Sequence, residues 1–176
     1  VDFTYTKFLK PLCLKLAQSG YAVHVAFTNA SRSYDCPATK QQQVCFHSVP
    51  ISRSSSPFAL VRATYALLKL FLHQKFTVVH VHTPVAAIST RIAAFLAGIP
   101  IVIYTAHGFY FHERMFLPLR FIHIFSEWFL AKFTTLLLTQ SYEDARLAKK
   151  LHFKKPSHII CIGNGVQPNS FRPSNI

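Results

Sequence analysis

The stretch from Val78 to His112 reads VVHVHTPVAAISTRIAAFLAGIPIVIYTAHGFYFH. A run of β-branched residues at its start predicts a strand, and the Ala-rich segment after Thr83 predicts a helix that ends at Gly98. A second apolar run, residues 101–105, predicts another strand. Two strands joined in this way run parallel, with a right-handed crossover. The stretch is therefore a βαβ unit.

The polar residues of this unit gather at one end of its strands. In open parallel sheets, ligands bind beyond the carboxyl ends of the strands. The residues that the sequence places there are His80, His82, Thr83, Thr105, His107, Gly108 and His112. We therefore expect the functional site at this edge of the sheet.

The rest of the chain continues the alternation of helices and strands. Strands are expected near residues 23–27, 44–49, 135–139 and 158–162, and helices near residues 7–18, 57–73, 118–132 and 141–151. This alternation predicts an α/β fold with a doubly wound, mostly parallel sheet. Because a helix precedes the first of these strands, we expect the first strand of the sheet to lie before Val1. The chain would then be an internal piece of a longer protein.

The chain is strongly basic, with 19 Lys and Arg against 6 Asp and Glu and a formal charge of +13. Such an excess attracts nucleic acid, anionic lipid or phosphorylated ligands. No stretch of about 20 residues is uninterruptedly apolar, so no transmembrane helix is expected. Basic residues combined with seventeen Phe suit a peripheral membrane protein at least as well as a nucleic-acid binder.

His107 is the first candidate for chemistry. It follows a strand and precedes Gly108, which allows close approach of the backbone. A histidine there can bind a hydroxyl or a phosphate and can be cationic near neutral pH; alternatively, it only fixes the loop through backbone bonds. His82 and Thr83 should face the same crevice, whereas His80, inside the strand, is expected to be a satisfied core or helix-contacting histidine.

Other chemistries are disfavoured. Four histidines in this region suggest zinc, but their spacing matches no usual ligand set and no carboxylate or cysteine lies nearby, so we expect no metal. The sequence has no Ser/His/Asp set, no P-loop and no G-x-G-x-x-G motif. With only 6 acids, hydrolysis by paired carboxylates is also disfavoured.

Five segments in the right order resemble the N-terminal domain of family 4 glycosyltransferases, and most of all the enzymes of exopolysaccharide and capsule assembly. The segments are VHVHTPVAA (78–86), GIP (98–100), YTAHGFYFH (104–112), FLKPL (8–12) with SGYAVH (19–24), and IGNGV (162–166) with FRP (171–173). The resemblance covers almost the whole chain. The sequence departs from the family pattern at Gly163, where Pro is usual, and at Gln167, where Asp is usual.

The resemblance implies two Rossmann-like domains facing each other across a cleft, the GT-B arrangement. Residues 1–166 would be the acceptor-binding domain and residues 167–176 the start of the interdomain linker, with a hinge at Asn164, Gly165 and Val166. The donor-binding domain, with its Glu-x7-Glu pair, would lie outside this chain. The reaction that the resemblance implies is sugar transfer from a UDP- or GDP-sugar to a lipid-linked or saccharide acceptor in cell-surface polysaccharide synthesis, with retention of configuration as the family pattern.

The resemblance also assigns roles to residues. His107 would be catalytic, and the acceptor would be bound by Asp2, Thr4, His82, Thr83, Gly108 and His112. Asp2 either orients an acceptor hydroxyl or bonds to backbone. Arg114, Phe116 and Arg120 would form a patch for a lipid phosphate and an anionic membrane surface, although Phe121 nearby is expected to face the core.

No cofactor is expected in this domain, and the nucleotide sugar is a co-substrate of the full-length enzyme. The protein would be cytoplasmic, at the inner face of the membrane, with its own donor domain as a partner and no nucleic acid. A second hypothesis stays open at this point: a non-catalytic basic α/β domain that binds nucleic acid or an anionic membrane surface.

Overall fold

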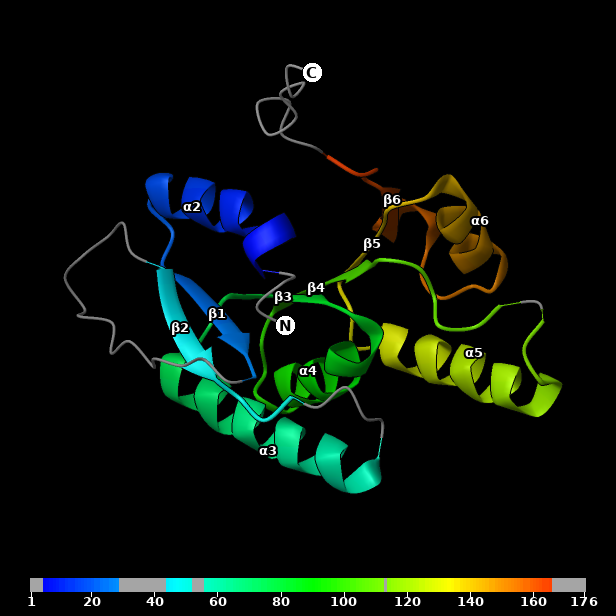
Figure 1. The fold of residues 1–176 in the computed structure, drawn as a ribbon, viewed down its shortest axis with the longest axis horizontal. Coiled ribbons are helices and arrows are strands. Elements are labelled where there is room, and N and C mark those ends of the chain that lie inside the picture. The colour runs from blue at the N-terminus through cyan, green and yellow to red at the C-terminus, as the bar shows by residue number, and fades with distance from the viewer. Residues whose placement is uncertain (1–4, 29–43, 52–55, 113, 166–176) are drawn as a thin grey trace, which may run out of the picture. The chain divides into compact units, whose positions relative to one another are not determined.

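The computed structural model describes residues 5–28, 44–51, 56–112 and 114–165 (Figure 1). In chain order, the elements are η1 (Tyr5–Leu9), α2 (Lys10–Gln18), β1 (Val23–Phe27), β2 (Val44–Ser48), α3 (Pro57–Gln74), β3 (Val78–His82), α4 (Pro84–Leu96), β4 (Ile101–Ala106), α5 (Leu117–Ala131), β5 (Leu136–Thr139), α6 (Tyr142–Lys150), η2 (Pro156–His158) and β6 (Ile159–Cys161). The chain divides into two compact units, Val1–Lys75 with Ile88–Ala97, and Phe76–Ala87 with Gly98–Ile176.

The first unit contains a two-stranded parallel sheet, in which β1 pairs with β2 from Val23↔Val44 to Phe27↔Ser48. The first helix differs from the expectation, because it opens as a π-helix, η1, before α2 begins at Lys10. Pro11 lies in the first turn of α2, where the missing N–H costs little.

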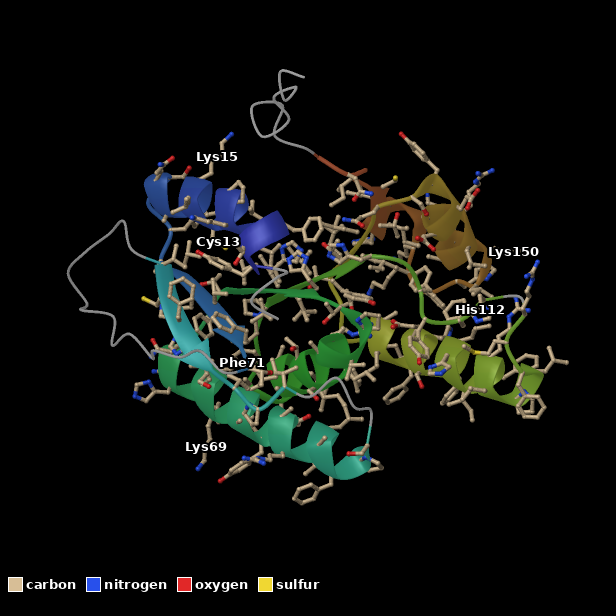
Figure 2. The ribbon with its side chains drawn as sticks, in the orientation of Figure 1. Cys13, Lys15, Lys69, Phe71, His112 and Lys150 are labelled. Carbon is tan, nitrogen blue, oxygen red and sulfur yellow. The ribbon has the colours of Figure 1, made fainter. Side chains whose placement is uncertain are left out.

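Helix α3 shows why its sequence forms an amphipathic helix. The hydroxyl of Ser56 accepts a hydrogen bond from the amide of Ala59 at 3.3 Å and caps the helix at its start. Ala63, Leu67 and Phe71, spaced four residues apart, are the buried residues of the helix. Figure 2 shows Lys69 pointing away from the side of α3 that carries Phe71.

The second unit contains a four-stranded sheet in the order β3-β4-β5-β6, and all of its strands are parallel. One register row across the sheet consists of apolar side chains that belong to the main core cluster: Val81, Tyr104, Leu137 and Ile159. Alternation along a strand sends the next row to the opposite face. That row contains His82, Thr105, Leu138 and Ile160. The sheet therefore has an apolar core face and a face that carries the candidate site.

The predicted α/β class with parallel sheets is confirmed, and the expected helices and strands agree with the structure to within about three residues at their ends. Ser141 caps α6, because its hydroxyl accepts from the amide of Asp144 at 3.0 Å. Among the described residues, no strand joins the β1-β2 sheet to the β3-β6 sheet.

Helix α5 corrects one expectation. Phe121 was expected to face the core, but its side chain is 66% exposed. The buried residues of α5 are Leu130 and Ala131, at its end, and Ile124 packs against the core from the middle of the helix, whereas Phe121, Ile122 and Phe125 are exposed. Within the described residues, no helix combines the length and the apolar character that crossing a bilayer needs.

Aromatic packing anchors the loop that follows β4. Phe109 and Phe111 stack with ring centroids 5.3 Å apart, and the edge of Phe153 meets both rings at 5.5 and 6.3 Å. Phe111 and Phe153 are buried, whereas Tyr110 is exposed. The loop is therefore held by alternate side chains, as a strand would be.

Replacing Phe153 by Ala should lower the free energy of unfolding by about 3–5 kcal/mol, because the change opens a cavity beneath the loop. Urea unfolding followed by far-UV circular dichroism measures this loss. The matched control is Phe58→Ala, since Phe58 is 79% exposed and its replacement should change stability by less than about 0.5 kcal/mol. Equal losses in the two variants would contradict the anchoring role of Phe153.

Candidate functional site

Three histidines come together where β3 and β4 end. Nδ1 of His82 lies 3.4 Å from Nε2 of His107, and the centroids of these two rings are 5.6 Å apart. The ring of His80 lies against that of His82, with centroids 4.1 Å apart. Nε2 of His80 is 2.7 Å from the hydroxyl of Thr105. We call these three rings and the Thr105 hydroxyl the histidine array.

The register of the two strands produces the array. His82 pairs with Thr105 across the β3-β4 ladder, and His107 follows the last residue of β4. His80 and His82 lie two residues apart on one strand, so their side chains leave the same face. The structure brings His82 and His107 together, and the crevice that they would share stays a prediction. His80 is a hydrogen-bonded, half-buried histidine as expected, but it also contacts the site, which was not expected.

Burial lowers the pKa of the two inner rings of the array, His80 and His82. Burial first, and the neighbouring His107 second, lower the pKa of His80 to about 4. Burial, then His80 and then His107, lower the pKa of His82 to about 3. Both rings are therefore neutral at neutral pH, whereas His107 is exposed at the outer end of the array.

Two loop residues beside the array have unusual backbone angles. Thr83, between β3 and α4, has a φ of +87°, which is rare for a β-branched residue. Such backbone strain persists where the surroundings enforce it, and it recurs at functional sites. Gly108 has a φ of +105°, and no heavy atom lies within 4 Å of the position that a Cβ would take. Gly108 is therefore needed for its backbone angle, and the described residues do not crowd it.

The remaining candidate residues are placed as follows. Asp2, Thr4 and Val166 lie outside the described residues. His112 is exposed, its carbonyl accepts from the amide of Met115 at 3.1 Å, and none of the ring contacts of the array involves it. Asn164 and Gly165 follow β6 as exposed, irregular chain.

Arg114, Phe116 and Arg120 lie at the start of α5, where Arg114 and Phe116 are exposed and Arg120 is half-buried, and many large apolar side chains of this helix form an exposed surface. We call this surface the α5 face; besides these three residues it includes Leu117, Leu119, Phe121, Ile122, Phe125, Trp128 and Phe129, all of them exposed to at least 38%. Phe116 is 75% exposed. Nε of Arg120 is buried and, among the described residues, makes no hydrogen bond. An unsatisfied buried donor of a charged group is costly, so an anion bound at Arg120 would stabilise it.

Two further observations concern metal binding and the location of the site. In residues 5–28, 44–51, 56–112 and 114–165, no group of three or more His, Cys, Asp or Glu side chains is arranged to hold a metal ion. A cavity of about 620 Å³ lies between α6 and β6, and its lining consists of Tyr142, Ala145, Arg146, Lys149, Ile159, Ile160 and Cys161. None of the candidate site residues lines this cavity, so we place the site by the strand ends and the histidine array.

Sequence reasoning missed two contributors to the site. Thr105 was recognised only as a polar residue at a strand end, although it is 2% exposed and anchors His80. The anchor of the His107 loop, Phe109 and Phe111 on Phe153, was not foreseen. The alternation of Phe109 and Phe111 with Tyr110 and His112 is a signal that could have revealed which side chains point inward.

Comparisons with known proteins agree with this picture. Residues 7–170 match the profile of Glycosyltransferase Family 4. The chain is 34% identical over 124 residues to the UDP-Gal:alpha-D-GlcNAc-diphosphoundecaprenol alpha-1,3-galactosyltransferase of Escherichia coli, covering 70% of this chain and 32% of that protein. It is 30% identical over 176 residues to EpsD of Bacillus subtilis (strain 168), whose name places it among the glycosyltransferases, covering 98% of this chain and 44% of EpsD.

A solved structure has the same fold. The crystal structure of MurG from Acinetobacter baumannii matches with a TM-score of 0.54 and 16% sequence identity, over 92% of this chain and 42% of that protein. The parallel α/β architecture with carboxyl-end histidines thus defines a Rossmann-like domain of the kind found in GT-B proteins. The chain belongs to Glycosyltransferase Family 4. It spans less than half the length of the curated relatives that it matches.

The pKa values of the array predict how stability changes with pH. The folded-state pKa values of His80 and His82 lie below the ordinary value of 6.5. Their neutral forms are therefore favoured by folding, and this stability is fully present above pH 6.5 and is lost as the pH falls toward 4 and then 3. Between pH 6.5 and pH 5, each histidine should cost up to about 2 kcal/mol.

Urea unfolding at pH 7 and at pH 5 measures this loss. His82→Asn should flatten the dependence, whereas His158→Asn, at an exposed histidine, should leave it intact. Some slope should remain in the His82 variant, because burial also lowers the pKa of His24 and of His47. Equal stability of the unmodified protein at the two pH values would contradict the buried, neutral state of the array.

Proposed function

We propose that this chain is the acceptor-binding half of a nucleotide-sugar-dependent glycosyltransferase that acts on a lipid-linked or saccharide acceptor in cell-surface polysaccharide synthesis. The observation that carries the proposal is the histidine array at the carboxyl ends of β3 and β4, in a chain of Glycosyltransferase Family 4. Ligand sites of parallel α/β sheets lie at this edge. Membership of Glycosyltransferase Family 4 favours an enzyme over the alternative of a non-catalytic basic domain that binds nucleic acid or an anionic membrane surface.

His107 is the residue that we propose to act on the acceptor. His107 is the exposed end of the array, so its ring can reach a bound hydroxyl. Its Nε2 contacts Nδ1 of His82. A histidine in this position can accept a hydrogen bond from the hydroxyl or donate one to a phosphate. Thr83, Gly108 and His112 would line the same edge, together with Asp2 and Thr4. The chain then supplies positioning of the acceptor, which is a large part of catalysis.

The donor would be held by a second domain of the same protein, with Asn164, Gly165 and Val166 at the hinge. Two facts support this arrangement: the chain spans less than half of its curated relatives, and the name of the E. coli relative contains both a UDP-sugar and a diphosphoundecaprenol acceptor. We therefore propose a UDP- or GDP-sugar as co-substrate, with no cofactor in this domain. The family resemblance favours retention of configuration at the sugar.

The α5 face would place the enzyme on the inner face of the membrane, where a lipid-linked acceptor presents its phosphates. Exposed Phe and Trp side chains insert into the headgroup region, and cations beside them attract anionic lipid. The cations are Arg114, Arg120 and Lys132, and Nζ of Lys132 lies 4.1 Å from the centre of the Trp128 ring. Groups of exposed large apolar side chains, such as those of the α5 face, mark contact surfaces.

Replacing His107 by Ala in the full-length protein should lower the rate of sugar transfer about 100-fold or more, because a positioned acid–base group is lost. UDP-galactose and GlcNAc-diphosphoundecaprenol are the first substrates to try, since they appear in the name of the E. coli relative. Release of UDP measures turnover. His152→Ala, at an exposed histidine outside the array, is the matched control. Undiminished turnover in the His107 variant would remove the role given to this residue.

Replacing Phe116 and Phe121 by Ser should weaken binding to vesicles that contain phosphatidylglycerol by about tenfold or more, because each buried Phe contributes about 1.5–3 kcal/mol. Sedimentation with vesicles measures the bound fraction. Tyr142→Ser is the control, since Tyr142 is 77% exposed on α6. The same affinity in the double variant and the control would mean that the α5 face does not contact lipid.

A further inference from the structure

Thr105, His80 and His82 form a series of contacts that ends at His107. The Thr105 hydroxyl meets Nε2 of His80 at 2.7 Å, the His80 ring lies against the His82 ring, and Nδ1 of His82 meets Nε2 of His107 at 3.4 Å. Thr105 is buried, and His80 and His82 are half-buried. Each member therefore limits the orientation of the next.

Strand geometry makes this chain of contacts rigid. Thr105 and His82 are opposite each other in the β3-β4 ladder, and His80 reaches Thr105 diagonally from two residues away on β3. His107 is the only member that lies outside a strand. Its ring is thus the end of the array that lies outside the sheet, and the inner end is held by the strands.

We propose that His80 and Thr105 are positioning residues, which hold His82 as a hydrogen-bond acceptor at Nδ1 and thereby keep a proton of His107 on Nε2. The inference rests on the proposed function, because it gives His107 a ligand on which to act. Neither His80 nor Thr105 has to touch the acceptor.

The neutral state of His82 determines which nitrogen donates in the hydrogen bond between His82 and His107. His82 is neutral, since burial and the adjacent rings hold its pKa far below neutrality. When His107 binds a second proton, both of its nitrogens become donors, and His82 can keep the contact only by accepting at Nδ1. The arrangement with the proton on Nε2 of His107 therefore serves both charge states of His107 without a change of partner, and a charged donor strengthens the bond.

The experiment uses the full-length protein labelled with nitrogen-15 in its histidines. Long-range proton–nitrogen spectra report which ring nitrogen of His107 is protonated, and sugar transfer is measured on the same samples. Thr105→Val removes the hydroxyl but keeps the shape of the side chain. His80→Phe keeps a ring against His82 but removes its nitrogens. Thr105→Ser restores the hydroxyl.

We expect His107 to be protonated on Nε2 in the unmodified protein and in Thr105→Ser, and to become a mixture of tautomers in Thr105→Val and His80→Phe. Turnover should fall roughly tenfold or more in the two disrupted variants, through kcat rather than the acceptor KM, and Thr105→Ser should restore it. An unchanged His107 tautomer in both disrupted variants would overturn the proposal. So would a Thr105→Ser variant that behaves like Thr105→Val.

The spectra separate this inference from the proposed function. The tautomer of His107 can be read without turnover, so a protein that transfers no sugar but shows the expected tautomer changes would contradict the proposed function alone. Full turnover in Thr105→Val and His80→Phe, with altered tautomers, would overturn the positioning role while leaving the glycosyltransferase assignment in place.

Discussion

The parallel pairing of β3 with β4 is the constraint on which the rest of the second unit depends. Its register runs from Val78↔Ile101 to His82↔Thr105. The same register sends Val81 and Tyr104 into the core and leaves His82 beside Thr105 on the other face. A slip of one residue would exchange the two faces and bury the histidines in the core. The hydrophobic row thus fixes the geometry of the site as well as the stability of the sheet.

Burial then gives the histidine array its chemical character. Two half-buried rings next to each other cannot both be charged, and desolvation is the largest cause of the lowered pKa of each ring. His80 and His82 are therefore neutral near neutral pH, and they contact His107 as neutral rings. Neutral neighbours can order a histidine by fixing the orientation of its ring. In this respect the arrangement resembles the support that other histidines receive from an acidic residue.

Much of the fold could be predicted from the sequence, because local signals agreed with each other. The β-branched run at Val78, the proline after Thr83 and the glycine at position 98 each mark an element boundary that the structure has within one or two residues. The cap at Ser141 is another such signal. Each of these depends on neighbours in the chain, which a single sequence displays directly.

Other features depend on residues far apart in the chain and could not be predicted. The contact of His80 with Thr105 spans 25 positions and needs the strand register. The exposure of Phe121 depends on which side of α5 faces the core, and a helix that is apolar over most of its surface gives no clear periodic signal to decide this. The positive φ of Thr83 is imposed by the tight passage from β3 into α4, against the preference of the residue itself.

The acceptor binds, in our proposal, at the carboxyl edge of β3 and β4. The most direct measurement is a titration of the full-length protein, with its histidine side chains observed by proton–nitrogen correlation, against the acceptor and the nucleotide sugar separately. We predict that GlcNAc-diphosphoundecaprenol, or a short-chain analogue, shifts the ring signals of His82 and His107, and that UDP-galactose alone leaves them in place. Ring signals that move with the nucleotide sugar and ignore the acceptor would contradict the claim.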